Sequence, residues 1–275
     1  MRIVMPLFDF FYRDKKEFIF TGGKYSLKRF VPEDEIPEID LFSKQDLRYM
    51  ELEQWALIAD VESDSSYKED INLLLLSFKI YKLSRLFIKY RLCKENSLRN
   101  FRLAETMQYV LREKSSDPIS FEDLLTVDKG FVRLLEMNGI SIRTHNALYF
   151  MYVGFFTRRW IEAFLFFMNA LEALFSKEEP GAATRTVCSR VSCLLESKDR
   201  CTYRDIEYLY NIRSRIVHGN IAARDDPDEN LINLHNLEYL LTECMKKILD
   251  EKIYLLYSDI DEKESFYDDL VARIR

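Results

Sequence analysis

In the second half of the chain, hydrophobic residues recur every three or four positions, and polar residues fill the intervals. This period matches the α-helical turn of 3.6 residues, so each such segment has one apolar side. Pro180-Gly181 and the acidic run 225–228 interrupt the pattern where helices are expected to end or begin. The pattern predicts helices over residues 120 to about 137, 144–176, 183–196, 202–218 and 228 to about 257.

Residues 1 to about 90 have a different pattern, in which short aromatic and branched runs alternate with polar stretches. Thr21-Gly-Gly-Lys24 predicts a hairpin turn between one such run, residues 17–20, and the next, residues 25–27. Residues 43–57 suit a helix and a strand equally well. Runs of this kind are typical of a small antiparallel sheet, with strands expected at residues 3–5, 8–12, 18–20 and 73–81.

The two patterns meet at the polar segment 114–118, whose Ser, Asp and Pro residues are typical of a loop. We therefore expect an α+β protein of two domains. Residues 1–118 would form a small, mainly β accessory domain with some helix, and residues 119–275 an all-α helical bundle. The chain has 7 Gly and 6 Pro among 275 residues, which favours long helices over a turn-rich β-sandwich.

Composition favours a cytoplasmic protein. Arg158, Arg159, Glu162 and Glu172 interrupt the most apolar region, residues 147–175, so it predicts a core helix and not a membrane span. The N-terminus lacks the small-residue cleavage site of a signal peptide. The 5 cysteines are odd in number and include no Cys-x-x-Cys pair, which indicates reduced thiols.

The sequence offers few ligands for a metal ion or a phosphate group. The 3 histidines, His145, His218 and His235, are widely spaced and lie in no zinc-binding motif. No Gly-rich phosphate loop is present either. We therefore expect no metal and no cofactor, which disfavours a phosphotransferase or a metal hydrolase.

Charge is distributed unevenly, although the net charge of the chain is only −6. Residues 180–224 contain eight Lys or Arg and four Asp or Glu, a net charge of +4, whereas residues 225–275 have a net charge of −8. A nucleic acid would be attracted to the first segment and repelled by the second, so binding would be local. The alternative is that these arginines are simply solvated on helix surfaces.

Residues 211–220 place an arginine and a histidine in an otherwise apolar helical stretch. Arg213 falls inside the apolar arc, and a buried guanidinium requires a counter-charge. Glu172, at the edge of the apolar stripe of the preceding long helix, is the predicted partner. His218 falls at the helix end, and Gly219 follows where a positive φ is needed.

Two interpretations of Arg213 and His218 remain open. The residues are separated by about 140° around an ideal helix and by about 7.5 Å along it, so they share no face. They are either a structural ion-pair member and a helix-terminal histidine, or a catalytic pair. The catalytic interpretation requires Arg213 to reach around the helix, the last turn to unwind, or a second copy of the chain to complete the site.

Residues 169–175, Arg185 and residues 210–219 together resemble the HEPN superfamily (higher eukaryotes and prokaryotes nucleotide-binding), specifically its Apea-like branch. The family signature is an arginine, four to six residues and a histidine, which corresponds here to Arg213 and His218. The resemblance extends over roughly residues 127–256. It implies a helical bundle that forms homodimers and cleaves RNA without a metal, by attack of the ribose 2′-hydroxyl on the adjacent phosphate.

The resemblance also implies roles for individual residues. His218 would act as general base or acid, because an imidazole has a pKa of about 6.5. Arg213 would bind and neutralise the phosphate, and Ser214 would add a hydrogen bond. Glu172, Arg185 and Tyr210 would support the site. One departure is that active members often carry Asn, Asp or His where Ser214 stands.

The resemblance leaves two functions to distinguish. The first is an endoribonuclease with its site at a dimer cleft, in prokaryotic antiviral defence, abortive infection or a toxin–antitoxin pair, with an antitoxin or regulatory partner. Residues 1–118 would then sense a signal or direct the nuclease. The second is a non-catalytic HEPN-type module that dimerises and binds RNA, a nucleotide or a partner protein. The net negative charge and Ser214 favour the second, and the Arg213–His218 motif favours the first.

Overall fold

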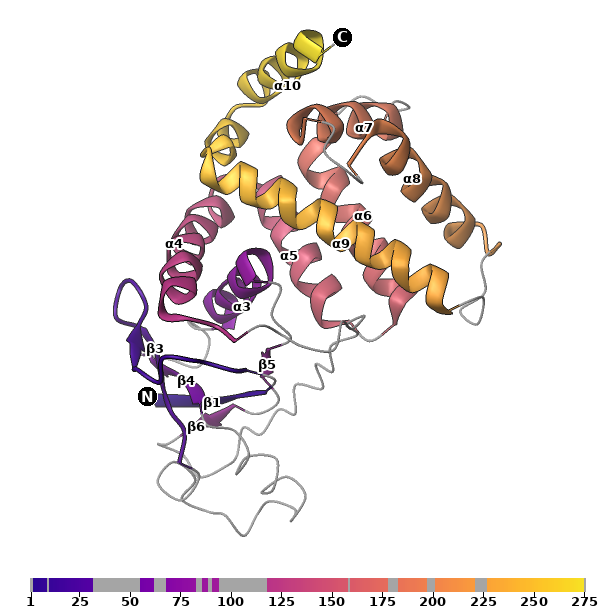
Figure 1. Cartoon of the computed structure of the whole chain (residues 1–275). Helices are drawn as coiled ribbons and strands as arrows, with labels where there is room; N and C mark the ends of the chain where they lie inside the picture. The colour runs from indigo at the N-terminus through magenta and orange to yellow at the C-terminus, as the bar shows by residue number, and fades with distance from the viewer. Residues whose placement is uncertain are drawn as a thin grey trace. The chain divides into compact units, whose positions relative to one another are not determined.

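The computed structural model describes residues 2–8, 10–31, 55–61, 68–82, 86–88, 91–93, 118–157, 159–177, 183–196, 201–220 and 227–274. The chain consists of two compact units, one mixed and one helical, as the α+β prediction required (Figure 1). The division between them falls inside helix α4 (Phe121–Asn138), between Val132 and Arg133. The predicted boundary at residue 118 adjoins a segment outside the described residues.

The first unit contains an antiparallel sheet with the order β2-β3-β4-β1, and short strands β5 and β6 pair with the other edge of β1. Strands β1 and β4 are almost fully buried, which explains why their sequences are continuously apolar and do not alternate. The strands are β1 (Arg2–Phe8), β2 (Phe18–Ile19), β3 (Tyr25–Arg29), β4 (Trp55–Asp60), β5 (Phe87–Ile88) and β6 (Leu92–Cys93).

Several strand predictions are confirmed. Residues 3–5 lie in β1, and the predicted hairpin joins β2 to β3 with Phe18 opposite Leu27. Gly22 and Gly23 have φ values of 85° and 69°, which a glycine adopts without steric cost. Of residues 8–12, only Phe8 lies in a strand among those described. Residues 55–57 belong to β4, and the rest of the ambiguous 43–57 segment lies outside the described residues.

The prediction of a strand at residues 73–81 is wrong, because the segment lies in helix α3 (Lys68–Lys82). The residues from Leu73 to Ile80 are all buried, so no helical alternation of apolar and polar positions marks the sequence. Leucine favours helices, and the charges at the two ends of α3 complement the helix dipole. Ser77 Oγ donates a hydrogen bond to the carbonyl oxygen of Val127 in α4, at 2.6 Å.

The second unit is helical. The predicted helices at 120–137, 183–196 and 202–218 are confirmed as α4, α7 and α8. The helix predicted to reach residue 257 ends earlier, where Lys252 adopts a left-handed conformation with φ 56°. Helix α10 was not predicted. The elements after α4 are α5 (Ile142–Phe156), α6 (Trp160–Phe175), α7 (Ala183–Leu194), α8 (Tyr203–Val217), α9 (Pro227–Asp250), the 3-10 helix η2 (Ile253–Ser258) and α10 (Ile260–Ile274).

The prediction of one long helix over residues 144–176 is also wrong, because the chain reverses between α5 and α6. Thr157 and Arg159 have extended backbones at this break. Phe150 contacts Phe166 near the middle of the pair, and Arg143 donates a hydrogen bond to the carbonyl oxygen of Ser176 at the end away from the reversal. In one continuous helix the apolar surfaces of the two segments could not pack on each other, whereas the α5–α6 hairpin buries both surfaces.

The interior of the helical unit lies between α6 and the helices that pack on it, namely α5, α7, α8 and α9. Leu171 and Leu174 of α6 are fully buried, as are Leu240 and Leu241 of α9. No helix among the described residues combines the length and the apolarity needed to cross a bilayer.

Candidate functional site

Helix α8 carries the Arg213–His218 motif, and both of its ends are fixed by local sequence. Thr202 caps the N-terminus in a capping box with Asp205. At the other end Gly219 has φ 72°, as predicted. The amides of Gly219 and Asn220 donate to the carbonyl oxygens of Ile216 and Arg215, at 3.0 and 2.7 Å. This is a Schellman motif, and it holds His218 at a defined position on the helix end.

Arg213 lies at the border of the buried face of α8. The buried residues of this helix are Ile206, Leu209, Tyr210 and Ile212. Arg213 Nη2 donates to Glu172 Oε2 of α6 at 3.3 Å, so the predicted pair is confirmed. The two side chains are 34% and 26% exposed, and the ion pair is therefore half-buried. About a third of the Arg213 side chain remains accessible to solvent.

The surroundings of this pair contain unsatisfied polar groups. Arg213 Nε and the Tyr210 hydroxyl are both buried and have no hydrogen-bond partner among the described residues. Burial raises the pKa of Tyr210, and the negative charge of Glu172 raises it further, so the hydroxyl is protonated. Glu172, Tyr210 and Arg213 therefore form one electrostatic cluster between α6 and α8.

His218 lies apart from this cluster. It is the C-terminal cap of α8, and its backbone amide donates to the carbonyl oxygen of Ser214 at 3.0 Å. The residue is exposed, and no described side chain pairs with its ring. Since Arg213 turns towards Glu172, a single copy of the chain does not bring the guanidinium and the imidazole onto one face.

Two other residues predicted for the site, Ser214 and Arg185, lie outside the cluster of Glu172, Tyr210 and Arg213. Ser214 is exposed on α8, beside Arg213 in sequence. Arg185 lies in the first turn of α7, where its charge acts on Tyr203, the first residue of α8. Tyr203 and Val217 are about 21 Å apart along α8, so Arg185 belongs to the opposite end of that helix from His218. The structure does not bring Arg185 to the motif.

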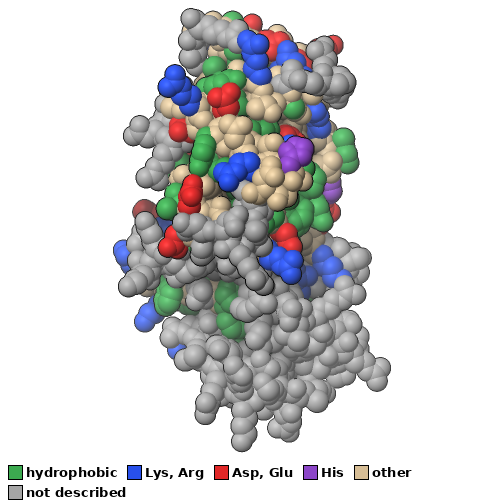
Figure 2. Space-filling view, turned by 90° about the vertical axis from the view of Figure 1, so that its right-hand side faces the viewer, with side chains coloured by type: hydrophobic (Ala, Val, Ile, Leu, Met, Phe, Trp, Pro, Cys, Tyr) green, Lys and Arg blue, Asp and Glu red, His purple; other side chains and the backbone are tan. Residues whose placement is uncertain are grey.

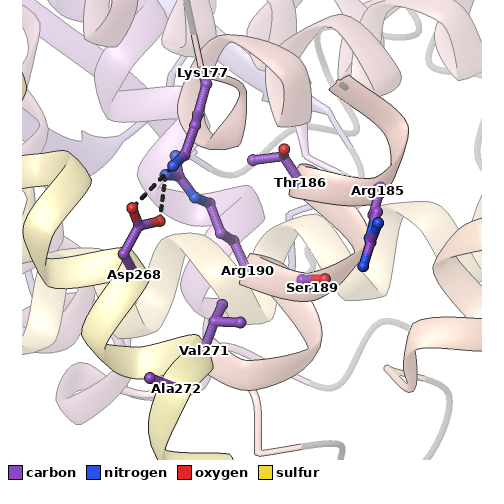
Figure 3. Close-up of a pocket in the computed structure, with 8 residues that line it drawn as sticks. All are labelled: Lys177, Arg185, Thr186, Ser189, Arg190, Asp268, Val271 and Ala272. Atoms are coloured by element: carbon purple, nitrogen blue, oxygen red, sulfur yellow. Dashed lines mark hydrogen bonds and ion pairs between the residues drawn. The ribbon is translucent and has the colours of Figure 1, made fainter. Parts of the chain in front are cut away.

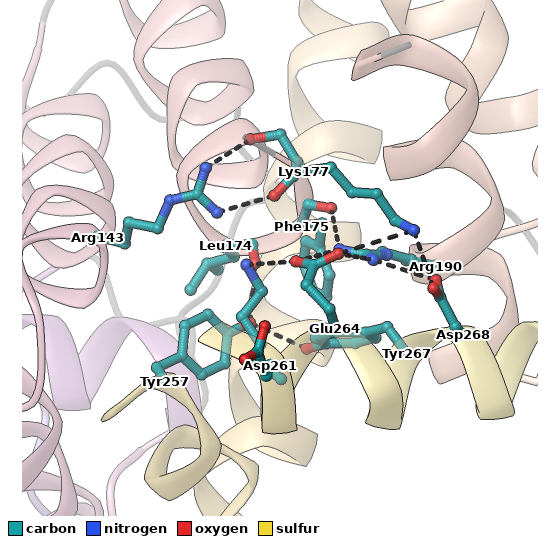
Figure 4. A network of polar contacts seen from close by, with 12 residues as sticks. Arg143, Leu174, Phe175, Lys177, Arg190, Tyr257, Asp261, Glu264, Tyr267 and Asp268 are labelled. Carbon is teal, nitrogen blue, oxygen red and sulfur yellow. Dashed lines mark hydrogen bonds and ion pairs between the residues drawn. The ribbon is translucent and has the colours of Figure 1, made fainter. Parts of the chain in front are cut away.

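The strongest charged cluster was missed at the level of sequence. Arg190 of α7 is only 1% exposed, and it pairs with Glu264 and Asp268 of α10 (Figure 4). Its Nη1 also donates to the carbonyl oxygen of Phe175 at 3.1 Å. The guanidinium carbon lies 5.1 Å from the ring centre of Tyr267, a cation–π contact. This cluster attaches α10 to α7.

The pKa values in this cluster follow from competing effects. Burial alone would raise the pKa of Glu264, but hydrogen bonds from Arg190 and Lys263 outweigh it and lower the pKa to about 2. The pKa of Lys263 is lowered by burial. A usable sequence signal existed, because Arg190 lies in the apolar arc of α7, as the sequence predicted for Arg213 in α8. An unpaired guanidinium buried at either position would carry the same kind of cost.

On the described surface of the helical unit that Figure 2 shows, isolated Lys and Arg side chains lie among acidic and hydrophobic ones. No group of three or more His, Cys, Asp or Glu is placed to hold a metal ion in the described part of the chain. His145 pairs with Asn138 at 3.1 Å, and His235 is exposed on α9.

Comparisons with known proteins return no relative: no protein-family model, curated protein or solved structure matches the chain. Evidence for a function therefore comes from the geometry of α6 and α8 and from the Arg213–His218 motif of α8.

Proposed function

We propose that the chain is a metal-independent endoribonuclease of HEPN type, with Arg213 and His218 as its catalytic residues. The observation that supports this most is the pairing of two features on α8. His218 is exposed on a rigid helix end, and Arg213 is oriented by Glu172 yet remains one-third exposed. An oriented cation and an accessible imidazole are the groups that phosphodiester cleavage needs.

The proposed chemistry uses the RNA itself as the nucleophile. His218 accepts the proton of a ribose 2′-hydroxyl, and the 2′-oxygen forms a bond to the adjacent phosphorus. The bond from phosphorus to the 5′-oxygen breaks, and that oxygen takes a proton from a general acid. The products are a 2′,3′-cyclic phosphate and a 5′-hydroxyl. Arg213 stabilises the additional negative charge on the phosphate as it develops.

A second copy of the chain completes the site in this proposal. Within one copy, Arg213 and His218 lie about 140° apart around α8. A twofold axis near the C-terminal end of α8 would place His218 of one copy beside Arg213 of the other. The proposal therefore includes a homodimer formed through the helical unit, with RNA as its partner.

The decisive experiment measures cleavage of a labelled RNA by purified protein in EDTA. We expect His218→Ala and Arg213→Ala each to reduce the rate by about 100-fold or more, as removal of a general base or of a charge-stabilising donor does. His235→Ala is the matched control, since His235 is also exposed on a helix of this unit. A 2′-deoxy nucleotide at the cleaved position should block the reaction. Unchanged cleavage by either site variant would contradict the proposal.

A non-catalytic HEPN-type module is the second candidate, and the Arg213–Glu172 ion pair favours it. A guanidinium bonded to a carboxylate has less capacity for a phosphate, as expected of a structural residue. Such a module would dimerise and bind RNA, a nucleotide or a protein, and His218→Ala would leave that binding intact. Toxicity on overexpression that His218→Ala relieves would support the enzyme.

We assign the nuclease to the cytoplasm and to antiviral defence, abortive infection or a toxin–antitoxin pair, with an antitoxin or regulatory protein as partner. The mixed N-terminal unit would restrain or direct it. Co-expression with the products of neighbouring genes, scored by relief of toxicity, tests this role directly.

A further inference from the structure

A cavity of about 310 Å³ lies between α7 and α10, at the C-terminal end of α6 (Figure 3). The side chains from α7 and the end of α6 are polar or basic, whereas α10 contributes an apolar part. The cavity is lined by Lys177, Arg185, Thr186, Ser189, Arg190, Asp268, Val271 and Ala272. Its volume is at the lower end of the range for small-molecule sites, about 300 to 1,000 Å³.

Two of the three cations of this cavity, Arg190 and Lys177, are held in place before any ligand arrives. Arg190 is fixed by Glu264 and Asp268, and Lys177 Nζ lies 2.9 Å from Asp268 Oδ2. In the view of Figure 3, these groups occupy one side and Arg185 the other, with Thr186 between them. Fixed donors recognise a ligand with little loss of conformational entropy.

Arg185 differs from the other two cations. In the described part of the chain, no carboxylate pairs with it, although Lys177 and Arg190 both have acidic partners. Thr186 and Ser189 add hydroxyl donors within one turn of α7. Three cations and one carboxylate line the cavity, so its lining carries a net charge of +2. An anion with several acceptor oxygens would satisfy these donors.

We propose that this cavity binds a small molecule carrying a phosphate monoester. The phosphate contacts Arg185, Thr186 and Ser189, with Lys177 at the far side. Val271 and Ala272 of α10 contact the organic part of the molecule, which the volume limits to about the size of a mononucleotide or a sugar phosphate. The ligand bridges α7 and α10, so its binding stabilises the attachment of α10.

This site is separate from the proposed nuclease centre. Arg185 belongs to the end of α8 that carries Tyr203, and His218 lies at the other end, about 21 Å away along the helix. The proposal therefore does not depend on RNA cleavage. His218→Ala, which tests the nuclease, should bind the phosphorylated ligand with unchanged affinity.

The test is calorimetric titration of the full chain, at about 0.15 M salt to screen weak surface attraction. The probes are inorganic phosphate, ribose 5-phosphate and adenosine monophosphate, with ribose as the uncharged comparison. Arg185→Ala removes the unpaired cation at an exposed position, and Ala272→Phe fills the cavity without changing its charge. Arg159→Ala is the matched control, because Arg159 is exposed at the opposite end of α6.

We expect saturable binding of ribose 5-phosphate or adenosine monophosphate, about tenfold weaker or more in Arg185→Ala and Ala272→Phe and unchanged in Arg159→Ala. Binding of inorganic phosphate with equal affinity would contradict the proposed contact of Val271 and Ala272 with the organic part of the ligand. The proposal is overturned if no probe saturates, if both cavity variants bind like the parent protein, or if only an RNA oligonucleotide binds. Circular dichroism of each variant checks that the helical unit is intact.

Discussion

Arg213 shows how a single inward-facing charge constrains a structure. The residue interrupts the apolar face of α8, and burying it alone would cost several kcal/mol or more. Burying the Glu172 carboxylate of α6 without a partner would also cost free energy. The 3.3 Å contact between the two groups offsets both costs. Because the partner can be inferred from this cost, the pair could be predicted from sequence without any homologue.

Glu172→Gln should destabilise the helical unit by about 1 kcal/mol, because Arg213 then keeps only a neutral partner in a half-buried position. The free energy of unfolding in urea measures this loss. A double-mutant cycle with Arg213→Gln isolates the coupling between the two side chains. If the effects of the two changes simply add, the ion pair contributes nothing to stability.

Glu162→Gln provides the control for Glu172→Gln. Glu162 lies on the same helix and pairs with Arg159, but Arg159 is 82% exposed, and such surface pairs contribute little. We expect its free energy of unfolding to match that of the parent protein. In the cleavage assay, Glu172→Gln should slow the reaction less than Arg213→Ala, since Glu172 only positions the arginine.

At the level of elements, the α5–α6 hairpin depends on one close contact. Gly154 of α5 faces Phe167 of α6, and a Cβ atom at this position would lie 2.5 Å from the Cε1 atom of that ring. Phe167 is itself buried and packs against Phe155, so the ring has little freedom to move aside. The glycine in the last turn of α5 therefore has a packing reason.

Gly154→Ala should destabilise the protein by about 1 to 3 kcal/mol, the usual cost of overpacking a core. This outcome opposes the ordinary gain of up to about 1 kcal/mol for replacing a helical glycine by alanine. Thermal unfolding measures the change. Gly139→Ala is the control, because its Cβ would meet nothing closer than 3.7 Å. Recovery in Gly154→Ala with Phe167→Leu would identify the ring as the cause.

Some helices have residues that mark their ends in the sequence, and others have none. Helix α8 was predictable because Thr202 and Gly219 mark its two ends. The reversal between α5 and α6 was not, because neither Gly nor Pro occupies residues 157–159 and both helices are apolar. The α3 segment has no visible period, since it is buried almost throughout. Tertiary packing decided both cases.

For the molecule as a whole, the candidate site was predictable in part. Burial cost identified Arg213 with Glu172, and backbone geometry identified Gly219. The position of Arg185 depends on how α7 packs beside α8, which no local pattern contains. The cluster around Arg190 depends on α10, a helix that was not predicted.

The cluster around Arg190 also makes the stability of the protein depend on pH in the acidic range. Glu264 has a pKa of about 2 in the folded protein, below its ordinary value of 4.5, so the carboxylate is stabilised by folding. A group with a lowered pKa contributes its full stability above the ordinary value and loses it as the pH falls towards the folded value. The contribution from Glu264 should therefore decline between about pH 4.5 and pH 2.

Glu264→Gln should be less stable than the parent protein at pH 7, and the difference should shrink on acidification to pH 3. Urea unfolding midpoints between pH 7 and pH 3 measure both trends. Some pH dependence should remain in the variant, because the ion pairs with Lys177 and Arg190 also lower the pKa of Asp268. Glu262→Gln, at an exposed position of α10, should follow the parent profile. Parallel profiles for Glu264→Gln and the parent would mean that the Arg190 cluster does not attach α10 in solution.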